Sequence, residues 1–175
     1  MRFRNIRSSA SGKRAMLAAI RGCLSNEPSD VATQVAVHMR FLRLPGIHHD
    51  SAALVIEDAG QVVVVDPGTS WYQVLVSARV ETLVGNQPKQ IWLTHRHFEV
   101  AGAAHYLSEA WGATIHAHHS AESSLSIGER LTTNARSFDS EMPIAEIETC
   151  SDGDQFTIGS CEFTVLHLPG HTNCG

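Results

Sequence analysis

The chain has 175 residues, of which 43% are hydrophobic and 18% are charged, and its formal net charge is -5. This length favours a single domain, and the composition is ordinary for a globular protein. The negative charge excludes a nucleic-acid binder that relies on bulk electrostatics. Histidine is the unusual residue: there are eleven, and a density of six between residues 95 and 119 indicates metal or acid–base chemistry.

The first 30 residues form a basic extension in front of the predicted domain at 31–175. Six Lys and Arg residues precede the first acidic residue, Glu27. Residues 1–26 have the composition of an organelle transit peptide. The alternative is a plain basic extension, with a short amphipathic helix predicted over 13–24.

The cysteines and the hydropathy of the chain bear on its location. The four cysteines include no C-x-x-C pair, and a chain of this size needs no disulfide staples. We therefore expect a reducing, cytoplasmic compartment. No apolar run reaches the roughly 18 residues that span a bilayer, so we expect no membrane partner.

Short strand-like and helix-like runs alternate from residue 31 onward, which predicts an α/β fold. Helices are predicted over 71–86, 98–112 and 120–131. The apolar stripe of the first is Val74, Leu75, Ala78 and Leu83 or Val84, and that of the second is Val100, Ala103, Ala104, Leu107 and Trp111. Strands are predicted over 35–44, 52–58, 61–66, 88–94, 113–118, 154–159 and 161–168. The run 61–66 is nearly all valine, as expected of a strand that is covered on both faces.

The stretch THRHFEVAG, residues 94–102, carries the first candidate site. His95 and His97 follow a predicted strand, where residues two apart point to the same side of an extended backbone. The carboxyl end of a sheet strand is also where open α/β sheets bind their ligands. Two imidazoles would supply two of the three protein ligands of a catalytic zinc. His171 follows another predicted strand and a Pro-Gly turn, and it is the candidate for the third.

Three stretches in this order and spacing resemble the metallo-β-lactamase fold superfamily: VVVVDPGTS, THRHFEVAG and DGDQFTIGSCEFTVLHLPGHT. The resemblance covers roughly Val35 to Gly175 and is strongest to the glyoxalase-II-like branch of thioesterases and small-molecule hydrolases. It implies an αββα sandwich, of which this chain would hold only the N-terminal part. It also implies that His95, His97 and His171 are the ligands of the first metal position, with Asp66 near the metals.

The sequence departs from the T-H-x-H-x-D-H motif of that superfamily at two positions. Glu99 stands where the motif has Asp, and Val100 stands where it has its last His. The resemblance also places a bridging aspartate, a late histidine and the second half of the sandwich beyond Gly175. We therefore expect one metal ion: zinc, with iron or manganese as alternatives.

These observations predict a weak metal-dependent hydrolase that acts on an ester, a thioester or a similar small molecule. Glu99 is the only carboxylate placed to orient water or accept its proton. Asp66 either supports the metal centre or tethers its own turn. The alternative is a non-catalytic or vestigial metal-binding fragment of such a hydrolase.

Three further alternatives concern the ligands and the reaction. Cys174 could complete a His₃Cys site, which would make the zinc structural. An iron oxygenase of the persulfide-dioxygenase type needs a late Asp ligand, and a nuclease needs an inserted domain; the sequence has neither. Six other histidines are predicted to be loop or structural residues: His48, His49, His105, His116, His118 and His119. Of these, His118 is the one most able to approach the cleft.

Overall fold

The computed structural model describes residues 19–21 and 39–175, and its strands form two sheets. The six-stranded sheet has the order β2-β3-β4-β5-β6-β7, with strands Arg40–Leu44, Ala53–Asp58, Gln61–Val65, Gln90–Trp92, Thr114–His118 and Glu148–Cys150. The three-stranded sheet has the order β1-β9-β8, with strands Ala19–Arg21, Cys161–Thr164 and Gln155–Ile158. The helices are α1 (Gln73–Leu83), α2 (Phe98–Ala101), α3 (Ala104–Trp111) and α4 (Glu122–Leu125), with 3-10 turns η1 (Ser70–Tyr72), η2 (His119–Ala121) and η3 (Ala135–Phe138).

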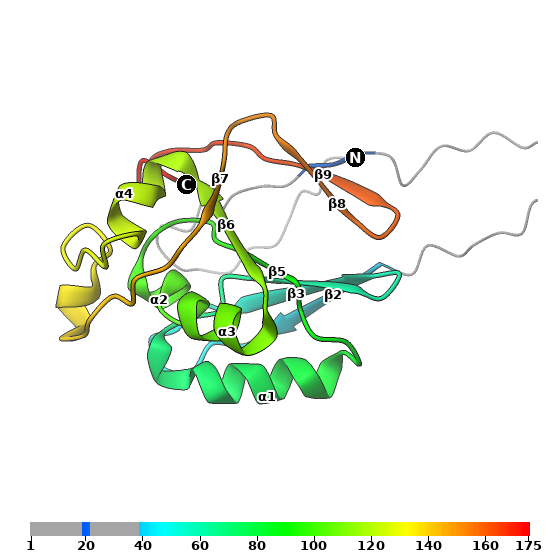
Figure 1. Cartoon of the computed structure of the whole chain (residues 1–175), viewed down its shortest axis with the longest axis horizontal. Helices are drawn as coiled ribbons and strands as arrows, with labels where there is room; N and C mark the ends of the chain where they lie inside the picture. Colours follow the sequence, from blue (N-terminus) through cyan, green and yellow to red (C-terminus); the bar gives the residue numbers. More distant parts are fainter. Residues whose placement is uncertain (1–18, 22–38) are drawn as a thin grey trace, which may run out of the picture.

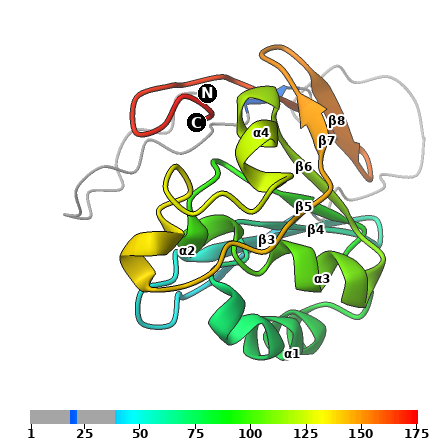
Figure 2. The same ribbon diagram turned by 60° about the vertical axis from the view of Figure 1, so that its left-hand side comes forward.

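The six-stranded sheet is the middle layer of the molecule. Helices α1, α2 and α3 cover one of its faces, and the hairpin of β8 and β9 lies over the other (Figures 1 and 2). The strand pairs from β4 to β7 are parallel, whereas β2, β3 and β4 are antiparallel. This arrangement confirms the predicted α/β class and matches the αββ part of an αββα sandwich.

The valine run of β4 is buried on both faces, as predicted. Val62 and Val64 belong to the core beneath the helices, and Val63 belongs to the smaller core between the two sheets. That second core also contains Trp92 and Phe163, whose rings meet at 5.4 Å. Strand β4 therefore sits between two apolar layers, which is why it needs no polar face.

Helix α1 buries a different face from the one that its sequence predicted. Val76, Val80 and the following Val84 are buried, whereas Val74 is 74% exposed and Leu75 is 50% exposed. The helix carries apolar residues all round, so helical spacing alone could not select the buried stripe. The predicted assignment of Val74 and Leu75 to the core is wrong. Packing against the sheet determines which face of α1 is buried.

The predicted helix over 98–112 is confirmed, with a break between α2 and α3. All five residues of its predicted stripe are buried. Phe98 packs so closely on Gly102 that a Cβ there would lie 2.8 Å from the ring. Glycine is therefore required where the two short helices meet.

Three other elements differ from their prediction. Residues 19–21 form β1, so the helix predicted over 13–24 is wrong there, because pairing with β9 overrides local propensity. The rest of that helix, and all of the proposed transit peptide except residues 19–21, lie outside the described residues. The helix predicted over 120–131 is limited to η2 and α4, and strand β7 was missed. Within residues 19–21 and 39–175, no helix has the length and hydropathy to cross a membrane.

Candidate metal centre

Three histidines from two distant segments meet beyond the ends of sheet strands. His95 and His97 lie between β5 and α2, and His171 lies in the segment that follows β9. The three ring centroids are 4.7–5.0 Å apart, and each pair of rings is close to perpendicular, at 73–82°. We call His95, His97 and His171 the imidazole triad. The rings are T-shaped to one another, and each residue offers a ring nitrogen within 4.8 Å of a nitrogen from each of the other two.

Glu99 joins the triad from the first turn of α2. One potential ligand atom from each of the four residues lies within 4.8 Å of every other. His171 Nε2 is 3.0 Å from His97 Nδ1, which in turn is 3.6 Å from Glu99 Oε1. Two ligands of a tetrahedral zinc, each about 2.0–2.1 Å from the ion, lie about 3.3 Å apart. The spacing of these donor atoms is therefore close to that of a zinc coordination shell.

The carboxylate of Glu99 is held in its ionised form. Burial raises the pKa of Glu99, but the hydrogen bond with the His97 side chain, a backbone hydrogen bond and the nearby imidazoles of His97 and His95 outweigh it, so the pKa lies below its ordinary value. Its second oxygen, Oε2, is buried and has no hydrogen-bond partner. A buried acceptor without a partner costs free energy, which a cation or a donor at this position would recover.

Asp66 acts on the triad through Thr94. Asp66 has a φ of 54°, in the left-handed region, and its carboxylate accepts hydrogen bonds from the Thr94 amide at 2.8 Å and the Thr94 hydroxyl at 2.7 Å. The Thr94 hydroxyl is also 3.0 Å from His95 Nδ1. Because its proton is given to the carboxylate, the hydroxyl oxygen accepts from His95 Nδ1–H. His95 Nε2 is then the nitrogen with the lone pair that a metal needs.

The residues present fit a divalent transition metal such as zinc. Three neutral imidazoles and one carboxylate are typical zinc donors, and the acidic group beside them is ionised. Asp66 lies outside the four-residue group and acts as a support for it. Thr94 was not singled out in the sequence, although a hydroxyl directly before the first histidine was a usable signal.

Two residues weighed in the sequence lie away from the donors. Val100 is 1% exposed and belongs to the core between the six-stranded sheet and the helices, so its side chain is not among the potential ligands. Cys174 is buried, outside the four-residue group, with its Sγ 3.3 Å from the Thr172 hydroxyl. The structure therefore does not support a His₃Cys centre.

A second set of histidines, which we call the imidazole stack, comprises His118, His119 and His167. The rings of His118 and His167 are 3.9 Å apart and nearly parallel, at 7°, and His119 lies 4.0 Å from His118. His118 Nδ1 bonds to the Ser120 hydroxyl at 2.7 Å, and His167 Nε2 is 2.9 Å from the Asn173 carbonyl. One ring nitrogen of His118 and one of His167 are thus used in hydrogen bonds, which agrees with the structural role predicted for His118.

The other histidines make separate contacts. His48 bonds through Nδ1 to the Tyr72 hydroxyl, His49 packs edge-on against Phe138, and His105 lies 3.8 Å from Glu109. His116 packs against Phe156. None of these four belongs to the group of donors around the triad.

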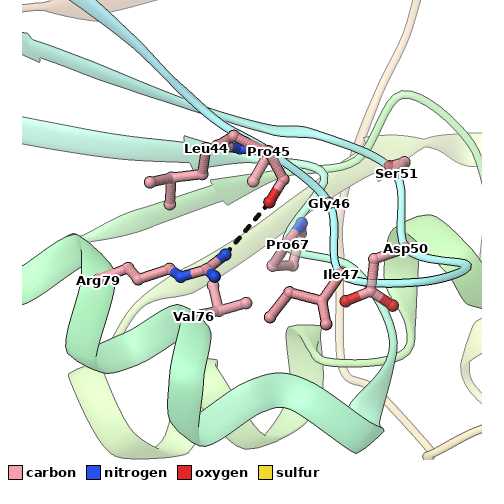
Figure 3. Close-up of a pocket in the computed structure, with 10 residues that line it drawn as sticks. Leu44, Pro45, Gly46, Ile47, Asp50, Ser51, Pro67, Val76 and Arg79 are labelled. Carbon is pink, nitrogen blue, oxygen red and sulfur yellow. Dashed lines mark hydrogen bonds between the residues drawn. The ribbon is translucent and has the colours of Figure 1, made fainter.

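A small pocket lies between the β2–β3 loop and α1, and none of the four potential metal ligands lines it (Figure 3). The Arg79 guanidinium donates to the Pro45 carbonyl at 3.2 Å across it. Its one acid is Asp50, whose pKa is raised by burial, against hydrogen bonds from Thr69 and the nearby His48 and His49. The pocket contains no cluster of nucleophiles or metal ligands, so the triad remains the candidate centre.

Comparison with known proteins identifies the family of the chain. The family described as the "Metallo-beta-lactamase superfamily" matches residues 48–175. A hydroxyacylglutathione hydrolase of Xylella fastidiosa (strain 9a5c) is 26% identical over 136 residues, which is 77% of this chain and 43% of that protein.

Solved structures show the same fold. The metallo-β-lactamase MIM-1 of Novosphingobium pentaromativorans is 26% identical, with a TM-score of 0.62 over 71% of this chain and 47% of its own. The subclass B3 enzyme BJP-1 of Bradyrhizobium japonicum is 19% identical, with a TM-score of 0.65 over 81% of this chain and 53% of its own. The chain spans about half the length of the curated relatives it matches. By its sequence match, its sheet order and its paired histidine motifs, the chain belongs to the metallo-beta-lactamase superfamily.

Proposed function

We propose that the protein binds one zinc ion through His95, His97 and His171 and hydrolyses a small ester or thioester. The observation that carries this proposal is the convergence of three imidazoles and one ionised carboxylate on a single point. Iron and manganese are the alternative metals, because both accept imidazole and carboxylate ligands.

The metal and the residues around it would have different roles in hydrolysis. A bound zinc ion would lower the pKa of a coordinated water toward about 7 and would polarise the substrate carbonyl. Glu99 would orient the attacking water and accept its proton. Asp66 and Thr94 would keep His95 in the tautomer that presents Nε2.

We expect the activity to be weak. The side chain of Glu99 is one methylene longer than the Asp of the superfamily motif, which would displace the carboxylate by about an ångström. A displacement of that size costs on the order of 100-fold in rate. Val100 is buried in the core, so the residue at the last position of the motif contributes no second-metal ligand.

The similarity to a hydroxyacylglutathione hydrolase favours a thioester among the possible substrates. A thioester carbonyl is an electrophile that an activated water can attack, with a thiol as the leaving group. The experiment is to measure the metal content of the purified protein and its hydrolysis of thioester and p-nitrophenyl ester panels. We expect about one zinc per chain and slow turnover that His171→Ala abolishes. Folded protein that contains no metal would refute the assignment of the ligands.

The second candidate function is metal binding without turnover. It is favoured by the position of Glu99, whose Oε1 is close enough to the triad to be a fourth ligand itself. Four protein ligands would close a tetrahedral site and leave no position for water. Glu99→Gln separates the two functions: loss of turnover with metal retained supports the hydrolase, and loss of metal supports the closed site.

A further inference from the structure

We propose that Arg96 and Asn173 are positioning residues that hold His171 in place to complete the metal centre. The proposal rests on the proposed metal site and explains how its third ligand is held. Two of the triad residues come from one short segment, but His171 is 74 residues further along the chain. The three ligands can meet only if other contacts hold the segment of His171 against the segment of His95 and His97.

The segment that carries His171 has no regular secondary structure. Residues 165–175, which we call the C-terminal loop, follow β9, and His171 itself is exposed. Within the loop, the Leu168 amide donates to the Gly175 carbonyl at 2.7 Å, and the Gly170 amide donates to the Thr172 carbonyl at 3.0 Å. These bonds close the loop on itself, but they do not attach it to the sheet.

Val165 and His167 bond the start of the loop to residues 152–154, and Asn173 attaches the part of the loop that follows His171. The side-chain oxygen of Asn173 accepts a hydrogen bond from Arg96 Nη1, and its backbone carbonyl accepts one from the Ser120 hydroxyl at 2.9 Å. His167 Nε2 lies 2.9 Å from the same carbonyl. The end of the chain accordingly lies beside α4 in both views (Figures 1 and 2). Asn173, two positions after His171, thus receives hydrogen bonds from two segments outside the loop, at Arg96 and Ser120.

Arg96 is well placed to organise this attachment because it lies between two triad residues. Its side chain points away from the imidazoles: Nε donates to the Thr132 carbonyl at 3.1 Å, and Nη1 donates to the Ser120 carbonyl at 3.4 Å as well as to Asn173. The planar guanidinium can hold several acceptors in a fixed geometry, which a lysine ammonium cannot do. The backbone that presents His95 and His97 is thereby tied to the loop that presents His171.

The physical consequence is a smaller entropic cost of binding the metal. Ordering a flexible backbone segment costs conformational entropy, which lowers the affinity of any ligand that must order the segment on binding. If Arg96 and Asn173 have already ordered the loop, the metal does not bear that cost. Contacts that orient metal ligands typically contribute 10–100-fold to metal affinity.

The test measures zinc and cobalt affinity by competition with a chromogenic chelator for the wild type, Arg96→Ala, Asn173→Ala and the double variant. We expect each single variant to bind about 10–100-fold more weakly and the double variant to be little worse than either single one. The visible absorption of bound cobalt should also change, because the position of His171 changes. Arg79→Ala is the matched control, since Arg79 also donates to a backbone carbonyl but contacts the β2–β3 loop.

Asn173→Asp is the rescue variant, because it retains an oxygen acceptor for Arg96, and we expect near wild-type affinity and cobalt absorption. Circular dichroism and thermal melts of the metal-free variants establish that each is folded. Should Arg96→Ala fail to fold, Asn173→Ala and Asn173→Asp carry the test, because both keep the backbone carbonyl. Metal binding by the wild type with unchanged affinity in Asn173→Ala overturns the positioning role alone. A folded wild type that binds no metal overturns the proposed function itself.

Discussion

The two histidine clusters place the same side chain in opposite arrangements. In the imidazole triad the rings meet at 73–82°, and their nitrogen atoms approach one another. In the imidazole stack the rings of His118 and His167 are nearly parallel, and their edge nitrogens are bonded to a hydroxyl and a carbonyl. Ring orientation, rather than the number of histidines, therefore separates a candidate metal centre from a structural contact.

The largest difference between the clusters is expected in metal content. His95→Ala or His171→Ala should reduce bound zinc from about one ion per chain to nearly none, because two imidazoles and a carboxylate rarely retain zinc against a chelator. His119→Ala, in the stack, should leave the stoichiometry unchanged. Atomic absorption of dialysed proteins makes the comparison, and equal loss in all three would mean that the clusters do not differ in function.

The next effect concerns the carboxylate that only the triad possesses. Glu99→Gln should lower kcat by about 10²–10⁴-fold, because the amide cannot accept the proton of water. Metal content should remain at about one ion if Glu99 is a base and not a ligand. Steady-state kinetics on a reactive ester, with metal analysis of the same samples, provide the measurement; an unchanged kcat would remove Glu99 from the reaction.

A smaller effect is expected from the support behind His95. Thr94→Val keeps the shape of the side chain but removes the hydroxyl between Asp66 and His95. The tautomer of His95 is then no longer fixed, and we expect zinc affinity to fall by about 10-fold. Thr82→Val is the control, since the Thr82 hydroxyl bonds only to the Ala78 carbonyl within α1. Equal affinities in the two variants would leave His95 without this support.

The smallest effect is a dependence of stability on pH that arises in the stack. Burial lowers the pKa of His118, and the neighbouring His167 and His119 lower it further, while Asp152 opposes them. The unfolded chain therefore binds a proton more readily than the folded one. Stability is fully present above the unfolded pKa of about 6.5 and declines as the pH falls below it.

Thermal melts of metal-free protein at about pH 7.5 and about pH 5.5 test this dependence within the range where histidine titrates. We expect the melting temperature of His118→Gln to fall less on acidification than that of the wild type. Because the two proteins differ only at His118, the difference between their melting temperatures reports this member of the stack. An identical fall in both proteins would place the acid sensitivity elsewhere in the chain.

Much of this molecule follows from patterns that are local in the sequence. The valines of β4, the stripe on α2 and α3, and the strand before His95 were all predicted, because period and turn residues report local backbone conformation. The glyoxalase-II-like motifs predicted that Glu99 and His171 belong to the candidate site, and both are in the group of potential metal ligands. Local patterns also identified Val100 as a residue that cannot be a ligand.

Other features depend on tertiary contacts: the buried face of a helix, the angles between histidine rings and the bonds between distant segments. Helix α1 is apolar on both sides, so contact with the sheet selected Val76 and Val80 over Val74. Motifs in the sequence selected the histidines of the triad, but the packing of β6 and the C-terminal loop set the ring angles of both clusters. The bond from Arg96 to Asn173 joins segments 77 residues apart. Such contacts depend on where the folded chain returns to itself, and no short stretch of sequence contains that information.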